Sequence, residues 1–258
     1  MCIPMDLKST TYCSRPGSFF GFIINAPSSL LLFIIGIIMC LRMITHTNSL
    51  HASIGRGEMK IILYSFVTNN FLLILSINFQ SFLLTLSSVI YAITAVFQLS
   101  ISSSLYFSIF ASGITIDRIY GIMRIPSHTF LMGVLFIFSF LMLAFNFLGL
   151  VINNPFIYII SLFINTISIS LYFLIQLRKL NKIKSDIWSY GVLSIIFFLY
   201  CFSLLPSFLL ADVVAVATEK HLDNMFIAQL FNTILIMMVH KYWLQTCDFE
   251  IECLELEA

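Results

Sequence analysis

Charged residues are scarce in this sequence. Its 258 residues include 13 Lys and Arg and 12 Asp and Glu, whereas 60% of the residues are hydrophobic. A soluble domain carries about a quarter charged residues, because polar groups must cover its surface. This composition excludes an ordinary soluble fold and predicts an integral membrane protein. The net charge of +1 also excludes nucleic-acid binding through a strongly basic surface.

The long apolar runs lack ionisable residues as well. No Asp, Glu, Lys or Arg lies well inside any of them, whereas proton pumps, ion-coupled carriers and voltage sensors place such groups within the membrane. The five histidines fall in loops or at helix ends, with no second ligand at metal spacing. No acid, base and nucleophile are positioned for catalysis. We therefore expect no enzyme activity, no cofactor and no metal site.

The charge-free runs that are present are long enough for seven membrane spans, since one helix needs about 20 apolar residues. We place these spans at about 19–41, 61–84, 90–116, 129–151, 156–177, 187–210 and 224–243. The turn signal Asn153-Asn154-Pro155 separates the fourth span from the fifth. The prediction is an all-α membrane protein in which residues 1–258 form a single seven-helix transmembrane domain.

The distribution of basic residues predicts the orientation of this bundle. With the N-terminus outside, the inner loops hold ten of the thirteen Lys and Arg, and the outer side keeps only Lys8, Arg15 and Lys220. Inner loops of membrane proteins carry an excess of Lys and Arg. We therefore expect the N-terminus outside, the C-terminus inside and a lipid bilayer around the spans.

Neutral polar residues form rows within the spans. In the fifth span Asn165 and Tyr172 share one helical face, and in the seventh span Gln229 and Thr233 share a face with Asn232 beside them. Such rows serve either as hydrogen bonds between helices or as contacts to a ligand in the bundle. Both interpretations stay open, and Asn165, Tyr172 and Gln229 are the candidate bundle-facing polar residues.

Small residues form a further row in the third span. Ser100, Ser104, Ser108, Ala111 and Thr115 repeat at intervals of three and four residues, so they share one face of a helix. Small residues on one face allow helices to approach closely in lipid. We expect this face to serve helix packing.

Three features resemble G-protein-coupled receptors of the rhodopsin-like type. The pair Asp117-Arg118 ends the third span, Pro206 lies inside the sixth, and Asn232 stands in the seventh where that family usually has an Asn-Pro-x-x-Tyr motif. The resemblance implies that Asp117 and Arg118 form the inner switch that meets the G protein. A proline within a helix produces a kink, so Pro206 is either a hinge or a fixed bend.

The retained topology, short loops and degraded motifs are most similar to nematode serpentine chemoreceptors, of class BC or a neighbouring class. This resemblance implies a chemosensory receptor that detects an environmental small molecule, an odorant or a pheromone, and signals to a heterotrimeric G protein. It also implies a multi-pass protein of the plasma membrane, in the cilium of a chemosensory neuron. The alternatives are a seven-helix ligand-gated channel subunit, a small transporter or a non-signalling receptor relic.

Overall fold

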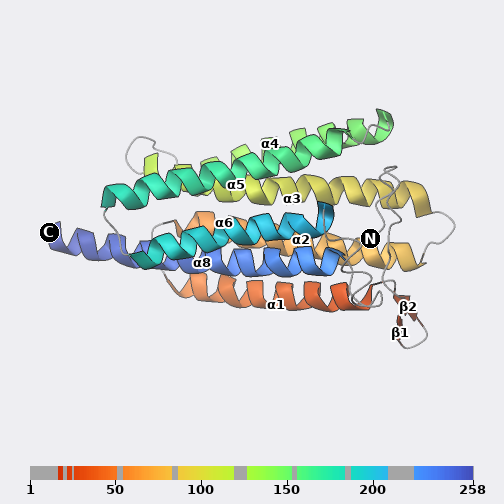
Figure 1. Cartoon of the computed structure of the whole chain (residues 1–258), viewed down its shortest axis with the longest axis horizontal. Helices are drawn as coiled ribbons and strands as arrows, with labels where there is room; N and C mark the ends of the chain where they lie inside the picture. Colours follow the sequence, from red (N-terminus) through yellow and green to blue (C-terminus); the bar gives the residue numbers. More distant parts are fainter. Residues whose placement is uncertain are drawn as a thin grey trace.

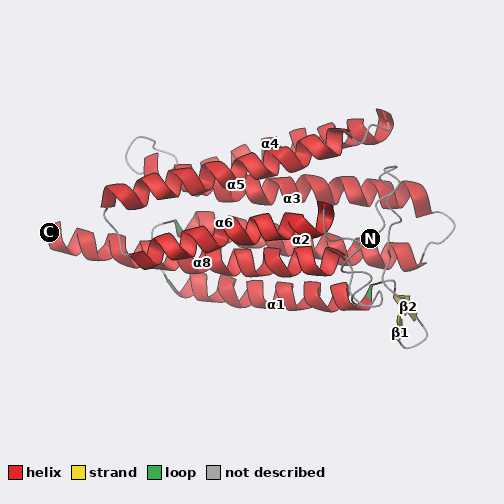
Figure 2. Cartoon of the chain, in the orientation of Figure 1, coloured by secondary structure: helices red, strands yellow, loops and turns green. Residues whose placement is uncertain are grey.

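In the computed structural model, the residues described are 17–19, 22–24, 26–50, 55–82, 87–118, 127–152, 156–183, 187–208 and 224–257. Helices make up nearly all of this structure (Figure 1, Figure 2). They are α1 (Pro27–Ser49), α2 (Arg56–Phe82), α3 (Ser87–Arg118), α4 (Ser127–Ile152), α5 (Phe156–Ile183), α6 (Ile187–Phe208) and α8 (Asn224–Glu257). A short antiparallel hairpin, β1 (Gly17–Phe19) with β2 (Phe22–Ile24), precedes them.

Seven helices are long and apolar enough, by length and composition, to cross a membrane. The prediction of a helical membrane protein with seven spans is therefore confirmed at this level. The backbone polar groups of a helix are satisfied within the helix, which is why helices suit a lipid solvent. The orientation of the bundle and the single-domain organisation stay predictions.

The helix ends differ from the span ends that the charge-free runs indicate. The β hairpin occupies residues that we assigned to the first span, and α1 begins at Pro27, where a proline fits because its missing N–H would have no partner there. At the other end of the chain, α8 continues to Glu257, well past residue 243. A charge-free run measures the part of a helix that lies in lipid, whereas the helix itself continues into water. The predicted turn Asn153-Asn154-Pro155 lies outside the described residues, between α4 and α5.

The helices lie side by side along one axis (Figure 1). Helix α3 packs against α2, α4 and α5, while α8 packs chiefly against α6 and also touches α1. The largest apolar core joins buried side chains of α1, α2, α3, α5, α6 and α8. Its bulkiest fully buried members include Phe66, Ile109, Ile169, Leu193 and Tyr200. Helices α3 and α8 thus each pack against several other helices, and both bring together segments that are far apart in the sequence.

The outer surface of the bundle is strongly apolar. Only 22% of the residues in the spanning window of α4 are buried, compared with 50% in α2. The exposed side of α4 carries Phe136, which is 76% exposed, and Phe140, which is 65% exposed. In water such a large apolar surface would promote aggregation, whereas in a bilayer lipid tails would cover it. The most apolar helix is thus the most exposed one.

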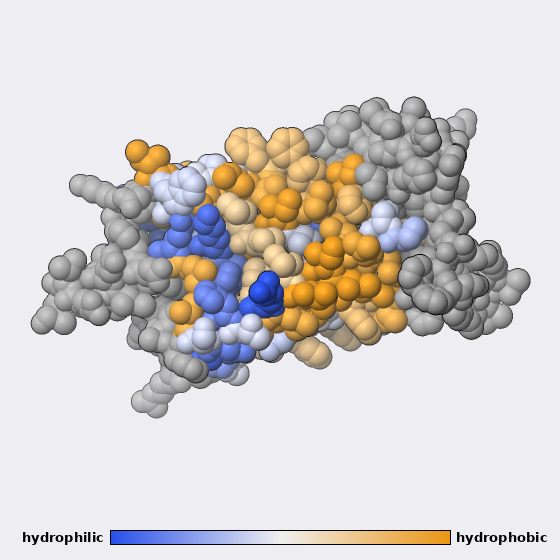
Figure 3. Space-filling model, turned by 90° about the horizontal axis from the view of Figure 1, so that it is seen from below, coloured by the Kyte–Doolittle hydropathy of each residue, from blue (hydrophilic) through white to orange (hydrophobic). Residues whose placement is uncertain are grey.

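Charged side chains gather at one end of the bundle. Arg42 near the end of α1, Arg178 and Lys182 near the end of α5 and Lys241 in α8 are all exposed. Figure 3 shows hydrophilic side chains toward the end from which α8 extends, whereas apolar side chains cover much of the rest of that face. We call this the charged end. The prediction that this end lies on the inner side of the membrane depends on these basic residues.

Candidate functional site

Helix α8 is joined to four other helices by side-chain hydrogen bonds. Near its N-terminal end, Gln229 Nε2 donates to Asn70 Oδ1 of α2 over 2.7 Å. One turn further along, the Tyr106 hydroxyl of α3 donates to Asn232 Oδ1 over 2.9 Å. Two of the polar residues that the sequence points out thus take part in contacts between helices.

Two further bonds join α8 to its neighbours closer to the charged end. Thr47 Oγ1 of α1 lies 3.2 Å from His240 Nε2, and the Tyr242 hydroxyl donates to Gln176 Oε1 of α5 over 3.2 Å. His240 is 7% exposed and lies within the bundle. Because each of these bonds connects α8 to a different helix, α8 fixes the relative positions of α1, α2, α3 and α5.

A second polar network joins α3, α4 and α5. Asn146 of α4, fully buried, donates from Nδ2 to Ser100 Oγ over 3.1 Å and accepts a bond of 2.7 Å from the Ser161 hydroxyl. Nearby, the hydroxyls of Ser104 and Ser139 lie 2.7 Å apart. The serine row of the third span therefore serves as a polar contact to α4 as well as a packing face. Sequence analysis missed Asn146, although a lone Asn within an apolar run is a signal for such a contact.

The structure places the remaining candidate residues separately. Asp117 and Arg118 are the last two residues of α3, and Pro206 lies within the last turn of α6; the side chains of all three are outside the described part of the structure. Asn165 is 5% exposed, and its Oδ1 has no hydrogen-bond partner among the described residues. Tyr172, also 5% exposed, lies far along α5 from Asn165, toward the charged end.

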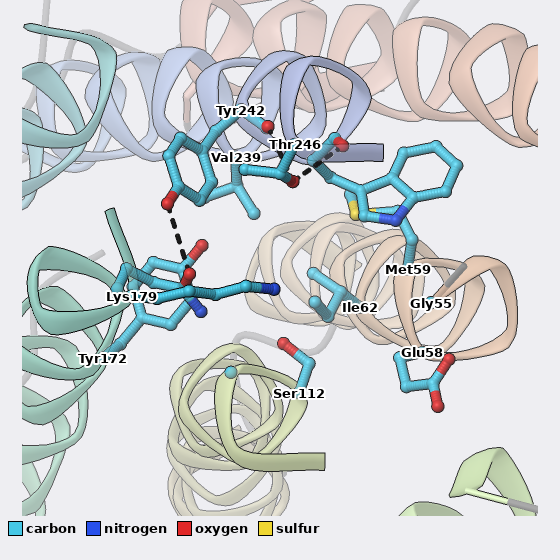
Figure 4. A pocket seen from close by; sticks show the side chains of 13 residues that line it. Gly55, Glu58, Met59, Ile62, Ser112, Tyr172, Lys179, Val239, Tyr242 and Thr246 are labelled. Atoms are coloured by element: carbon cyan, nitrogen blue, oxygen red, sulfur yellow. Dashed lines mark hydrogen bonds between the residues drawn. The ribbon is translucent and has the colours of Figure 1, made fainter. Parts of the chain in front are cut away.

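A small pocket lies at the charged end, where α2, α3, α5 and α8 meet (Figure 4). Its volume is about 30 Å³, which is room for one or two water molecules. Ordinary small-molecule sites have roughly 300–1,000 Å³. This pocket therefore has room for the tip of a side chain and none for an odorant-sized ligand.

Helix α5 contributes three polar residues to the wall of this pocket. Tyr172, Gln176 and Lys179 follow one another at intervals of four and three residues, so they share one helical face. In Figure 4 the Lys179 side chain reaches across the pocket, toward the side that carries Ser112 and Ile62. Glu58 of α2 also lines the pocket and is 2% exposed, and its carboxylate points away from Lys179 in that view.

Gly113 of α3 sets how closely α3 approaches this wall. A Cβ atom on Gly113 would lie 3.0 Å from both Tyr172 Cδ2 and Gln176 Nε2, which is tighter than ordinary van der Waals contact. The absence of a side chain at this position lets the tyrosine ring and the amide pack directly against α3. Within the described residues, no group of three or more His, Cys, Asp or Glu could hold a metal ion.

Comparison with known proteins gives a consistent result. A family model described as "Chitin synthase export chaperone" matches residues 8–253. A chitin synthase export chaperone of Phaeosphaeria nodorum is 24% identical over 221 residues, which cover 81% of this chain and 64% of that protein. One of Aspergillus fumigatus is 26% identical over 224 residues, covering 81% of this chain and 65% of that protein. The chain thus spans less than two thirds of the length of these relatives. No solved structure matches the chain.

These matches overturn the receptor interpretation. The chain is not a nematode serpentine chemoreceptor, and an odorant or pheromone ligand, a G-protein partner and a place in the plasma membrane of a sensory cilium were all wrong. The channel, transporter and receptor-relic alternatives do not match the family either. The features behind the resemblance have general causes: charges commonly mark the membrane borders of helices, and membrane helices tolerate proline.

Proposed function

Because the chain belongs to the chitin synthase export chaperone family, we propose that it is a membrane-embedded chaperone that assists the export of a chitin synthase. The observation that carries this proposal is the family match, which runs over nearly the whole chain, from residue 8 to residue 253. The curated relatives have the same description. The proposed partner is a chitin synthase, and the proposed place of action is the membrane of the endoplasmic reticulum, where membrane proteins assemble before export.

The structure of the bundle agrees with a role that needs no catalysis. Its polar side chains within the spans mostly bond to one another or to the helix backbone, as Asn70, Asn146 and Gln229 do. The pocket at the charged end is too small for a substrate molecule of ordinary size. A bundle of this kind is suited to binding another membrane protein. In the proposed orientation the charged end faces the cytosol.

Rescue of synthase export tests this proposal. Fungal cells that lack their own export chaperone would express this chain together with a tagged chitin synthase, and the fraction of synthase that reaches the cell surface would be measured. We expect the chain to restore surface delivery and to co-purify with the synthase in mild detergent. Cells with an inert seven-helix membrane protein at equal expression are the control. Retention of the synthase despite good expression of this chain would refute the proposal.

A further inference from the structure

Helices α3 and α5 each bury a side-chain oxygen that has no hydrogen-bond partner among the described residues. These atoms are Ser103 Oγ of α3 and Asn165 Oδ1 of α5. Ser103 is 1% exposed and Asn165 is 5% exposed, so both side chains lie inside the bundle. Four other serines of α3 donate their hydroxyls to backbone carbonyls of the same helix: Ser100, Ser104, Ser108 and Ser112. The Ser103 hydroxyl differs from these and stays available for a partner outside its own helix.

Both residues lie on the sides of α3 and α5 that are turned toward each other. A Cβ atom on Gly113 of α3 would lie 3.0 Å from both Tyr172 and Gln176 of α5, so these residues mark the contact between the two helices. Asn165 precedes Tyr172 by seven residues, which is about two turns, and therefore shares its face. Ser103 precedes Gly113 by ten residues, which is close to three turns, and lies on the same side of α3.

The two residues also lie at the same height in the bundle. Asn146 of α4 bonds to Ser100 of α3 and to Ser161 of α5, so these two serines are level with each other. Helices α3 and α5 run in the same direction (Figure 1). Ser103 follows Ser100 by three residues. Asn165 follows Ser161 by four residues, so both lie about one turn further along their helices. The two oxygen atoms without a described partner are thus neighbours across the α3–α5 contact.

We propose that one buried water molecule binds between Ser103 and Asn165 and joins α3 to α5. Buried polar atoms are almost always hydrogen-bonded, and buried waters typically bond to groups that would otherwise be unsatisfied. Asn165 Oδ1 only accepts, so the water donates one hydrogen to it, and the water oxygen accepts the hydrogen of the Ser103 hydroxyl. Both groups are neutral, which suits water better than an ion, because an ion buried here would need a compensating charge.

The sign of a stability change tests the proposal. The melting temperature of the purified chain in detergent would be measured for wild type and Asn165→Leu, which keeps a similar size and removes the acceptor. If water bonds to Asn165 Oδ1, the variant should melt about 2–4 °C lower, the shift that loss of one hydrogen bond produces in a chain of this size. A higher melting temperature would overturn the proposal, because removal of an unsatisfied buried oxygen stabilises a protein.

A double-mutant cycle shows whether the two residues hold the same water. Asn165→Leu and Ser103→Ala together should lower the melting temperature by less than their separate effects combined, because each removes the same water. Ser108→Ala is the matched control: Ser108 is as deeply buried in α3, but its hydroxyl already bonds to Leu105 O over 2.6 Å. The effects of Ser108→Ala and Asn165→Leu should simply add. Additive effects of Ser103→Ala and Asn165→Leu would also overturn the proposal.

A high-resolution cryo-electron microscopy map of the wild-type chain, bound to an antibody fragment, identifies the occupant directly. We expect a density peak at about 3 Å from both Ser103 Oγ and Asn165 Oδ1. A direct bond between these two side chains, with no peak between them, would overturn the proposal even if the double-mutant cycle shows coupling. A melting temperature that falls when choline chloride replaces sodium chloride would overturn it as well, because the occupant would then be a cation. The map needs no variant, so it decides the question even if Asn165→Leu fails to fold.

Discussion

Asn146 provides the sharpest test of how this bundle is held together. It is fully buried in α4 and makes one hydrogen bond to Ser100 of α3 and another to Ser161 of α5. Substitution by leucine, which has a similar size and shape, removes both bonds. The apolar packing around the position is largely kept, so the measured change reports the polar contacts.

The size of the effect follows from what each serine does after the substitution. Ser100 already donates its hydroxyl to Val96 O over 2.7 Å, and Ser161 has Ile157 O within 3.3 Å as an alternative acceptor. Neither serine is left without a partner, so no penalty for an unsatisfied group is added. Side-chain hydrogen bonds between membrane helices contribute about 0.6 kcal/mol on average and at most about 1.7 kcal/mol. We therefore expect Asn146→Leu to lower the free energy of unfolding by about 1 kcal/mol.

A double-mutant cycle in nanodiscs or detergent isolates the individual contact. The free energy of unfolding would be measured for wild type, Asn146→Leu, Ser161→Ala and the double variant, and Phe147→Leu on the exposed side of α4 serves as the control. We expect a coupling between Asn146 and Ser161 of about 0.6 kcal/mol and little coupling between Phe147 and Ser161. A coupling of zero, or an Asn146→Leu loss above about 4 kcal/mol, would refute the reasoning.

Three other substitutions test further features of the structure. Gly149→Ala should lower the thermal stability of the purified protein, because the added methyl would lie 2.8 Å from a side chain of α5. The control variant Gly133→Ala, whose methyl meets nothing within 4 Å, should leave the thermal stability unchanged. Equal stability of the two variants would contradict the α4–α5 contact. Tyr106→Phe should cost about 1 kcal/mol of unfolding free energy by removing the bond to Asn232, and an unchanged value would show that this bond is not formed. A cysteine at exposed Lys182 should react with a membrane-impermeant maleimide in sealed endoplasmic reticulum vesicles, whose outer face is the cytosolic one, and reaction only after detergent opens the vesicles would contradict the proposed orientation.

The seven-helix architecture could be predicted from the sequence because the bilayer sets a simple length requirement. Charge-free runs therefore counted the helices correctly even though they did not mark the helix ends. They could not show the β hairpin before Pro27 or the extension of α8 to Glu257, since neither depends on membrane thickness. The ends of the helices depend on local backbone chemistry and on the water outside the lipid.

The partners of the polar residues could be predicted only in part. Rows of neutral polar groups indicate which face of a helix is turned inward, and Gln229 and Asn232 do bond to neighbouring helices. The sequence alone does not show that Asn70 and Tyr106 are the residues opposite them, because that depends on which helices pack together. In the sequence Lys179 is recognisable only as one of the inner charges, because its place in a pocket depends on the meeting of four helices.

The same packing argument limits where a membrane chaperone can recognise its partner. Lipid tails are as apolar as leucine, so apolar contact alone gives two membrane proteins little reason to prefer one another over lipid. The exposed phenylalanines of α4 therefore cannot by themselves select the proposed partner, a chitin synthase. Several polar groups within the spans, such as those of Asn70 and Asn146, are occupied by contacts inside the bundle. If the proposed function holds, specific recognition requires polar or charged side chains that lie on the surface, and the exposed charges of the charged end are of this kind.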